Sequence, residues 1–511
     1  MGTADQAGSG SGVEPLVVDG RSLTVAGIRS AAFRTRPIEL AVTGRERARR
    51  SQEFADRTAG ERPLYGRSTG VGANRTVSVP GDSGDHAVRL LRSHAASTGE
   101  RRSPERVRAM LVVRLNQLAT GGSGVDPQVL DGLVAMIADD ALPAVRELGS
   151  IGTGDLSALA TTALALMGEG PTSSPVRHIT GFGPADGLAF ISSNAAVIAD
   201  AALAVSSIQE SAAAALVVAA LTFHAVDGNA EAYSDGALRT TPFAGAADAA
   251  RTMRSLIGAD PFGSRRSGPS GRAAARIQDP FGLRAIPQVN GPVLDRVAEA
   301  AEVVSRLANA PTENPLVAVD DADPTGGVVA HHAGFHQAYL QMALDSLALA
   351  VAQSGQLVLA RMATLIEPSF TGLPPFLGDG TPGASGVMVC EYVAASALGA
   401  MRAAAAPAGL QTVTLSRGVE EDASFASLAA TQCLTIADRY RQLVACELVT
   451  AVRALRMLDR PPAGRIEEIL ARCAALPTDL RDRDLTEDLA LAIDLLPALA
   501  ELTGRPAPAR S

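Results

Sequence analysis

A long alanine-rich stretch, residues 195–226, constrains the fold of this chain most strongly. Alanine has the highest helix propensity of all residues, whereas strands favour β-branched and aromatic side chains. Aromatic residues make up only 3% of the chain, although hydrophobic residues make up 47%. We therefore predict a mainly α-helical protein in which this stretch is a long buried helix of a bundle. The longest alanine-rich run within it, 211–223, is too short to span a bilayer.

The chain has 511 residues, which is enough for a large core and for more than one domain. We predict a disordered Gly/Ser-rich tail (1–12), an N-terminal domain (13–200), a central and C-terminal helical bundle (201–504) and a polar tail (505–511). Within the first domain, the alternating pattern of residues 16–26 predicts a short hairpin.

Charge and residue usage exclude several classes of function. The net charge is −9 without a long basic run, so nucleic acid is not an expected partner. Every basic residue is arginine, which excludes Schiff-base chemistry, pyridoxal phosphate attachment and a P-loop lysine. The four cysteines show no C-x-x-C spacing, so we expect buried reduced thiols. With no apolar signal core at the N-terminus, we predict a soluble, cytoplasmic protein.

The segment 149–156 is a glycine-rich loop that leads through Asp155 into an apolar run. An acidic residue in the first turn of a helix is favoured by the free N–H groups and the dipole there. A loop against a helix N-terminus can stabilise an anion or a developing negative charge. The alternative is an ordinary turn before a buried helix.

Residues 149–170 resemble the signature G-S-V-G-A-S-G-D-L-x-P-L-A … G-E-G of the aromatic amino acid ammonia-lyase family, which includes histidine and phenylalanine ammonia-lyases. In that family, the Ala-Ser-Gly triplet cyclises and loses two waters to give methylidene-imidazolone (MIO). Here the loop is one residue shorter, and Gly152-Thr153-Gly154 stands at the triplet. A group derived from Thr153 would carry an extra methyl group on its reactive carbon. We predict that no cofactor forms; if MIO does form, these three residues make it.

Further motifs of this family follow in the same order along the chain. Residues 65–72 resemble Y-G-x-x-T-G-F-G, which implies that Tyr65 is an acid–base residue whose pKa the nearby Arg67 could lower. Residues 90–96 and 114–124 match two scaffold motifs. Residues 186–194 resemble E-G-L-A-L-L-N-G-T, and the functional asparagine of the family falls on Ser192.

The substrate-binding motifs of the family are also present. Residues 278–291 resemble Q-D-P-Y-S-L-R-x-x-P-Q-V-x-G, which implies that Arg284 holds a substrate carboxylate. Phe281 replaces the family tyrosine in this motif, and Gln288 keeps the glutamine. Residues 313–316 resemble D-N-P-L, so the resemblance implies that Asn314 is a second polar contact.

Residues 331–336 replace the family's S-G-G-N-F-H and introduce His331 and His332, which we predict as acid–base groups because histidine titrates near neutrality. His332 and His336 are four residues apart and would share one face of a helix. Because the sequence offers no third ligand, we predict no metal site. Glu421 matches a catalytic glutamate of the family motif Q-E-D-H.

The resemblance covers about 13–502 and implies an elongated helical bundle with a smaller, loop-rich N-terminal region. It also implies a homotetramer whose active sites combine several subunits. We predict a MIO-independent enzyme of specialised metabolism that catalyses elimination, addition, isomerisation or cyclisation by acid–base chemistry on a small carboxylate-bearing molecule. One alternative is a true histidine, phenylalanine or tyrosine ammonia-lyase or aminomutase with a threonine-derived prosthetic group. Another is a non-catalytic subunit that pairs with an active paralogue.

Overall fold

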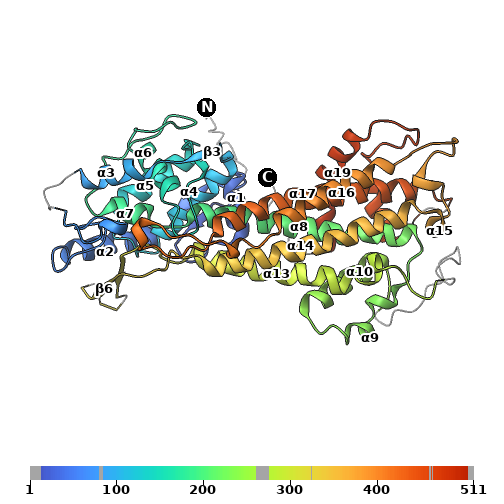
Figure 1. Ribbon diagram of the computed structural model, residues 1–511, viewed down its shortest axis with the longest axis horizontal. Helices are drawn as coiled ribbons and strands as arrows, with labels where there is room; N and C mark the ends of the chain where they lie inside the picture. The colour runs from blue at the N-terminus through green and yellow to red at the C-terminus, as the bar shows by residue number, and fades with distance from the viewer. Residues whose placement is uncertain are drawn as a thin grey trace, which may run out of the picture.

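The computed structural model describes residues 13–79, 85–260, 276–320, 322–323, 325–459, 462 and 464–504. These residues form a mainly helical, elongated molecule whose longest helices run along its long axis (Figure 1). The predicted fold class is confirmed. The four longest helices are α8 (Ala195–Ala225), α13 (Ile286–Ala308), α14 (Ala338–Ile366) and α17 (Ala426–Met457).

The N-terminal elements gather at one end of the molecule, drawn in blue to green in Figure 1. The helices of this end are α1 (Val25–Ala32), α2 (Val42–Arg57), η1 (Gly72–Asn74), α3 (His86–His94), α4 (Pro104–Leu118), α5 (Pro127–Ala138), α6 (Leu156–Leu166) and α7 (Asp186–Ile191). In the described part of the chain, the strands form three two-stranded sheets: β1 (Leu16–Val18) with β2 (Ile38–Leu40), β3 (Thr98–Arg101) with β4 (Arg146–Leu148), and β5 (Leu316–Val319) with β6 (Gly327–Ala330).

Shorter helices surround the remainder of the bundle. They are η2 (Ala230–Tyr233), α9 (Asp235–Leu238), α10 (Ala244–Ile257), α12 (Phe281–Arg284), α15 (Pro368–Thr371), η3 (Pro375–Leu377), α16 (Met388–Ala404), η4 (Ala408–Leu410), η5 (Ser416–Gly418), α18 (Arg465–Arg472), α19 (Thr486–Ala500) and η6 (Glu501–Thr503). Of these, α9, α10, α15, α16 and α19 lie toward the end opposite the N-terminal elements (Figure 1).

The helix predicted over 195–226 is α8, and it forms the centre of the core. It packs against α4, α13, α17 and α19 and is buried on nearly every side. Because alanine side chains are small, neighbouring helices approach α8 closely. The apolar surface of α8 is therefore buried by protein on nearly every side.

The alanine-rich run 211–223 lies inside a helical stretch that is much longer than the run itself. Three helical stretches of the described residues, Asp186–Ala225, Ala338–Ile366 and Met388–Leu410, are long and apolar enough to cross a membrane. In the first of them, 94% of the most apolar window is buried inside the protein. The apolar surface of this stretch is explained by its packing against neighbouring helices.

Two further predictions, a domain boundary and a hairpin, can be compared with the structure. The domain boundary predicted between 200 and 201 lies inside the continuous helix α8, and Asp200 there forms ion pairs with Arg102 and with Arg106, at 2.8 Å to the latter. The hairpin predicted over 16–26 is wrong, because β1 pairs in parallel with β2 and α1 lies between them. The predicted tails, 1–12 and 505–511, fall outside the described residues.

The far end of the bundle is fixed by a fully buried ion pair. Arg361 on α14 donates from Nε and Nη2 to the two carboxylate oxygens of Glu447 on α17, at 2.6 and 2.7 Å. Thr222 on α8 donates to the same carboxylate at 2.7 Å. A buried charge needs partners of this kind, so the three helices are held in one relative register. The four cysteines are free and buried, as predicted.

Candidate active site

The N-termini of four helices converge on the loop 149–155. α6 begins directly after the loop, and the buried Asp155 accepts hydrogen bonds from Ser150 Oγ at 2.7 Å and from the backbone N–H of Val197, in the first turn of α8, at 2.9 Å. Burial raises the pKa of Asp155, while these two hydrogen bonds oppose that shift. The carboxylate therefore ties the loop to the start of α8.

The other two helices bind the loop through their N-cap residues. Gln337, the N-cap of α14, donates its backbone N–H to Gly152 O at 3.3 Å, and Phe425, the N-cap of α17, donates to Ile151 O at 2.8 Å. The N-cap residues of these four helices make no side-chain hydrogen bond to their own helices, although Ser193 and Ser424 accept the first N–H groups of α8 and α17. Each of the four helices contributes the positive end of a helix dipole, which favours negative charge near the loop.

Gly152 lies at a position that leaves no room for a side chain. It has φ +83° and its carbonyl accepts a hydrogen bond from Ser424 Oγ at 2.8 Å. A Cβ atom at this position would lie 2.3 Å from that same oxygen and 2.6 Å from Ala426 N. The shortened loop therefore packs closely against Ser424 and Ala426 at the start of α17.

We expect Gly152→Ala to destabilise the protein by about 1–3 kcal/mol, the range for overpacking, with further strain from the positive φ. Gly399→Ala is a matched control, because a Cβ at Gly399 on α16 meets no heavy atom within 4 Å. Thermal unfolding of both variants measures the effect. Equal melting temperatures for the two variants would mean that the loop accommodates a Cβ at Gly152 in spite of these contacts.

Asn194, which the sequence motifs did not single out, binds the third residue of the triplet. Its Oδ1 accepts the backbone N–H of Gly154 at 3.0 Å, and its Nδ2 donates to Phe335 O at 2.5 Å. The motif had placed the functional polar residue at Ser192, whose Oγ instead accepts the backbone N–H of Asn314 at 3.1 Å. The sequence offered one signal for Asn194: it stands two residues after Ser192, the position that aligns with the functional asparagine of the family.

Tyr65 lies half-buried beside the site, and its hydroxyl oxygen accepts the backbone N–H of Gly72 at 2.8 Å. Burial raises its pKa, and the nearby Glu420 adds to this, while the Gly72 hydrogen bond and Arg75 oppose it. The suggestion that Arg67 lowers this pKa is wrong, because Arg67 turns away and donates to Ser123 O at 2.7 Å. Tyr65 is therefore a neutral phenol whose own proton can be donated.

The two histidines of the divergent segment have different surroundings. His331 Nε2 accepts the backbone N–H of Tyr65 at 3.2 Å, and burial, together with Arg62 and His332, lowers the pKa of His331. His332 is fully engaged: Nε2 lies 2.7 Å from Glu313 O, and Nδ1 accepts the N–H of Gly334 at 2.8 Å. With both ring nitrogens bound to the main chain, His332 is a structural residue, contrary to its predicted acid–base role.

The segment that carries these histidines is irregular, since α14 begins only at Ala338, so His332 and His336 do not share a helix face. Within the described ranges, no group of three or more His, Cys, Asp and Glu side chains is placed to hold a metal ion. Asn314 is anchored here, because its Oδ1 accepts the backbone N–H of His332 at 3.0 Å.

His336 and Gln337 are two further residues of the site that sequence reasoning did not assign. His336 Nε2 is buried and lies 3.3 Å from Asp422 Oδ2, outside hydrogen-bond geometry. The side-chain amide of Gln337 is buried with neither its oxygen nor its nitrogen bonded to any part of the chain that the structure describes. Glu421, next to Asp422, is exposed.

The predicted carboxylate clamp lies far from this loop within one chain. Gly282, two residues before Arg284, accepts a hydrogen bond from Arg361 Nη1 at 3.1 Å. Arg361 lies near the C-terminus of α14, and at 1.5 Å per residue it is about 35 Å from Ala338, where α14 leaves the loop. The predicted site residues therefore form two groups at opposite ends of the bundle.

The clamp itself is partly exposed. The Arg284 guanidinium stacks on Phe281 at 4.3 Å from the ring centroid, and Phe281 is 64% exposed. Arg284 Nε is buried without a hydrogen-bond partner among the described residues. Gln288 is exposed and donates to Thr241 Oγ1 at 3.1 Å.

Comparison with known proteins assigns this helical bundle to the carbon–nitrogen lyase-like enzymes. A family model described as aromatic amino acid lyase matches residues 23–475, and the chain belongs to that family.

Relatives and solved structures agree with this assignment. Histidine ammonia-lyase of Sorangium cellulosum is 32% identical over 503 residues, covering 93% of this chain and 96% of the relative. Histidine ammonia-lyase of Gloeobacter violaceus is 33% identical over 500 residues, with coverage of 94% and 95%. The structure of tyrosine aminomutase from Streptomyces globisporus superimposes with a TM-score of 0.87 at 26% identity, covering 96% of this chain and 98% of that one.

Proposed function

We propose that this protein is a MIO-independent member of its family that catalyses an acid–base reaction on a small molecule bearing a carboxylate. Elimination, addition, isomerisation and cyclisation are the reactions that this chemistry supports. The observation that carries the proposal is the position of Gly152, where a Cβ would meet Ser424 Oγ at 2.3 Å. The alanine that opens the family triplet has no room there.

The rest of the triplet also fits the prosthetic group poorly. Ring closure would join Gly154 N to the carbonyl carbon of Gly152, whereas the N–H of Gly154 is bonded to Asn194. Dehydration of Thr153 would leave a methyl group on the carbon that MIO exposes to attack. The residues present therefore do not fit MIO, and no step is assigned to it.

The chain's own groups provide an acid, a base and an anion-stabilising environment. The neutral phenol of Tyr65 donates a proton to the leaving or accepting group. His336 Nε2, with Asp422 beside it, takes a proton from a substrate carbon next to the carboxylate. The four helix N-termini stabilise the negative charge that develops between these two transfers. His331 is a second candidate base once its hydrogen bond to Tyr65 N–H is released.

We further propose a cytoplasmic homotetramer in which a second copy supplies Arg284. The solvent-facing side of α14 carries Tyr339, Met342 and Leu349, which are 83%, 68% and 52% exposed. On α16, Val389, Tyr392 and Val393 form a second apolar stripe. Apolar surface of this kind on long helices is typical of an interface between subunits. Such an interface offers a way to bring the clamp of one copy to the loop of another.

We expect the intact mass of the protein to equal the mass of its unmodified sequence. The reason is that the shortened loop is held by the hydrogen bonds of Gly152 and Gly154, which opposes ring closure. Mass spectrometry of the whole chain and of the peptide containing Thr153 measures this. Thr153→Ala is the matched control, because it removes the hydroxyl that dehydration requires. Loss of two waters at Gly152-Thr153-Gly154 in the wild type only would contradict the proposal.

One observation favours the second candidate function, a true ammonia-lyase or aminomutase with a threonine-derived group. The carbonyl of Gly152 receives hydrogen bonds from both Ser424 Oγ and Gln337 N–H, which would polarise it toward attack by an amide nitrogen. The names of the relatives agree with this candidate. Release of ammonia from histidine, phenylalanine or tyrosine by the purified protein would favour it. A stable tetramer that binds ligands without turnover would favour a non-catalytic subunit.

A further inference from the structure

Gln337 has a buried side-chain amide that the described part of the chain leaves unpaired. The residue is 1% exposed, and neither Oε1 nor Nε2 has a hydrogen-bond partner among the described residues. No other described side chain has two buried polar atoms that both lack a partner. Burying an amide without hydrogen bonds costs free energy, so a purely structural role does not account for this side chain.

The main chain fixes Gln337 beside the glycine loop. Its backbone N–H donates to Gly152 O at 3.3 Å, and its carbonyl group accepts the N–H of Gln341 at 3.0 Å. Gln337 is also the N-cap of α14, but its side chain makes no hydrogen bond to that helix. The amide therefore extends from a fixed backbone position at the loop on which the four helix N-termini converge.

Two polar side chains that hold the same loop already have partners within the chain. Asn194 binds the main chain at Gly154 and at Phe335. Ser424 Oγ donates to Gly152 O at 2.8 Å. These two side chains fix the conformation of the loop, whereas the amide of Gln337 keeps its donors and its acceptor for another group.

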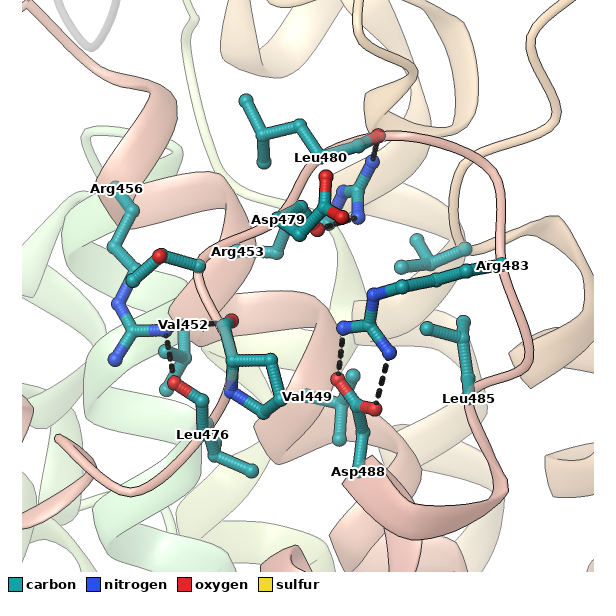
Figure 2. A pocket seen from close by; sticks show the side chains of 13 residues that line it. Val449, Val452, Arg453, Arg456, Leu476, Asp479, Leu480, Arg483, Leu485 and Asp488 are labelled. Atoms are coloured by element: carbon teal, nitrogen blue, oxygen red, sulfur yellow. Dashed lines mark hydrogen bonds and ion pairs between the residues drawn. The ribbon is translucent and has the colours of Figure 1, made fainter.

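Two polar side chains elsewhere in the bundle show the usual arrangement. Gln341, one turn further along α14, donates from Nε2 to Asp345 Oδ2 at 2.5 Å. Near the start of α19, Arg483 donates to both carboxylate oxygens of Asp488 at 2.7 and 2.6 Å, as Figure 2 shows. Gln337 departs from this arrangement at the loop where the proposed function places a small molecule.

The unpaired atoms indicate which chemical group would satisfy them. A glutamine amide presents one acceptor, Oε1, and two N–H donors on Nε2, all in one plane. A carboxylate would satisfy only the donors, and an ammonium group would satisfy only the acceptor. A carboxamide satisfies both, because its own carbonyl oxygen and N–H lie side by side in one plane.

We propose that Gln337 binds a carboxamide group of the substrate through two parallel hydrogen bonds, so that the substrate is a small carboxylate that also carries an amide. The inference rests on the proposed function for the carboxylate and adds a second polar group to the substrate. The side chain of Gln337 turns from its covered position to meet the ligand, and binding recovers the free energy that the unpaired amide costs. Because His336 is the adjacent residue, this contact also holds the ligand near the proposed base.

Ligand binding to the full-length protein, followed by saturation-transfer NMR titration, tests the proposal without turnover. The probes are succinamate, glutaramate and adipamate, each paired with the methyl ketone of equal length. The ketone keeps the carbonyl group and the negative charge but has no N–H to donate to Oε1 of Gln337. At one of these lengths or more, the wild type should bind the amide about tenfold more tightly than the ketone, because an unpaired buried acceptor is costly.

Two leucine variants on α14 and at its N-cap distinguish a binding role from a structural one. Gln337→Leu should bind the amide and the ketone of each pair equally, and it should melt no lower than the wild type, because it removes an unpaired amide. Gln341→Leu is the matched control. It should keep the preference for amides and melt lower, because it loses the hydrogen bond to Asp345.

Equal binding of amide and ketone by the wild type at all three lengths, or binding of neither, would overturn the proposal. A melting temperature of Gln337→Leu as low as that of Gln341→Leu would overturn it too, because the amide would then be bonded within the protein. Loss of two waters at Gly152-Thr153-Gly154 would overturn the MIO-independent function alone, since neither the binding preference nor the melting temperatures depend on turnover.

Discussion

Tyr65→Phe is expected to lower turnover by about 10²–10⁴-fold, the usual contribution of a general acid or base. The substitution removes the hydroxyl that accepts the Gly72 N–H and that carries the transferable proton. Because burial raises the pKa of Tyr65, its acid form persists to a pH above the ordinary value of about 10. The limb of the pH–rate profile that Tyr65 controls should therefore lie above that value, with activity falling as the phenol ionises.

Single-turnover rates measure this effect once a substrate is identified. Arg472→Gln is the control, because it changes an exposed side chain on α18 that belongs neither to the site nor to the proposed interface. His336→Gln should reduce the rate as well, whereas His332→Gln should mainly reduce stability, since its ring nitrogens hold the main chain. Wild-type rates in both Tyr65→Phe and His336→Gln would leave the reaction without its proton carriers and favour the non-catalytic subunit.

Arg284→Lys is expected to weaken binding of the carboxylate ligand by about 1.5–3 kcal/mol, the range for hydrogen bonds to charged groups. The planar guanidinium presents two parallel donors to a carboxylate, and an ammonium group cannot reproduce that geometry. Arg284 also stacks on Phe281, so lysine loses this support. Isothermal titration with the ligand measures the change. Unchanged affinity in the folded variant would mean that another residue anchors the carboxylate.

The distance between Arg284 and the glycine loop allows a sharper test of the same clamp. If one copy supplies Tyr65 and another supplies Arg284, hybrid assemblies of Tyr65→Phe and Arg284→Gln chains contain sites in which both residues are wild type. Random mixing of equal amounts should then restore about a quarter of the wild-type activity, because the two contributions are independent in a symmetric oligomer. Mixing assembled variants without subunit exchange is the control. If co-assembled chains stay inactive, the clamp and the loop do not share a site.

Much of the fold was predictable because its causes are local. The alanine-rich stretch forms α8 through its own helix propensity, and its bounds differ from the prediction only at the last residue. The order of motifs likewise indicated the family, and the loop before α6 was recognised from three glycines and Asp155. These features depend on residues close together in the sequence, which composition and spacing report directly.

The details of the site depended on contacts between distant segments. Sequence alone pointed to Ser192, whereas the side chain that reaches Gly154 belongs to Asn194. It assigned His332 a catalytic role, but both ring nitrogens bind the main chain. In each case a motif names a residue but does not determine the direction in which its side chain points, which the packing of neighbouring elements determines.

The sequence by itself determined the helical class, the family and the types of chemical group available: the guanidinium of Arg284, the phenol of Tyr65 and a shortened glycine-rich loop. Only the tertiary structure decided that four helices begin at one loop, that Ser424 leaves no room for a Cβ at Gly152, and that Arg284 lies at the other end of α14. Helix propensity acts over a few residues, whereas the positions of helix ends follow from how long helices pack over the whole bundle.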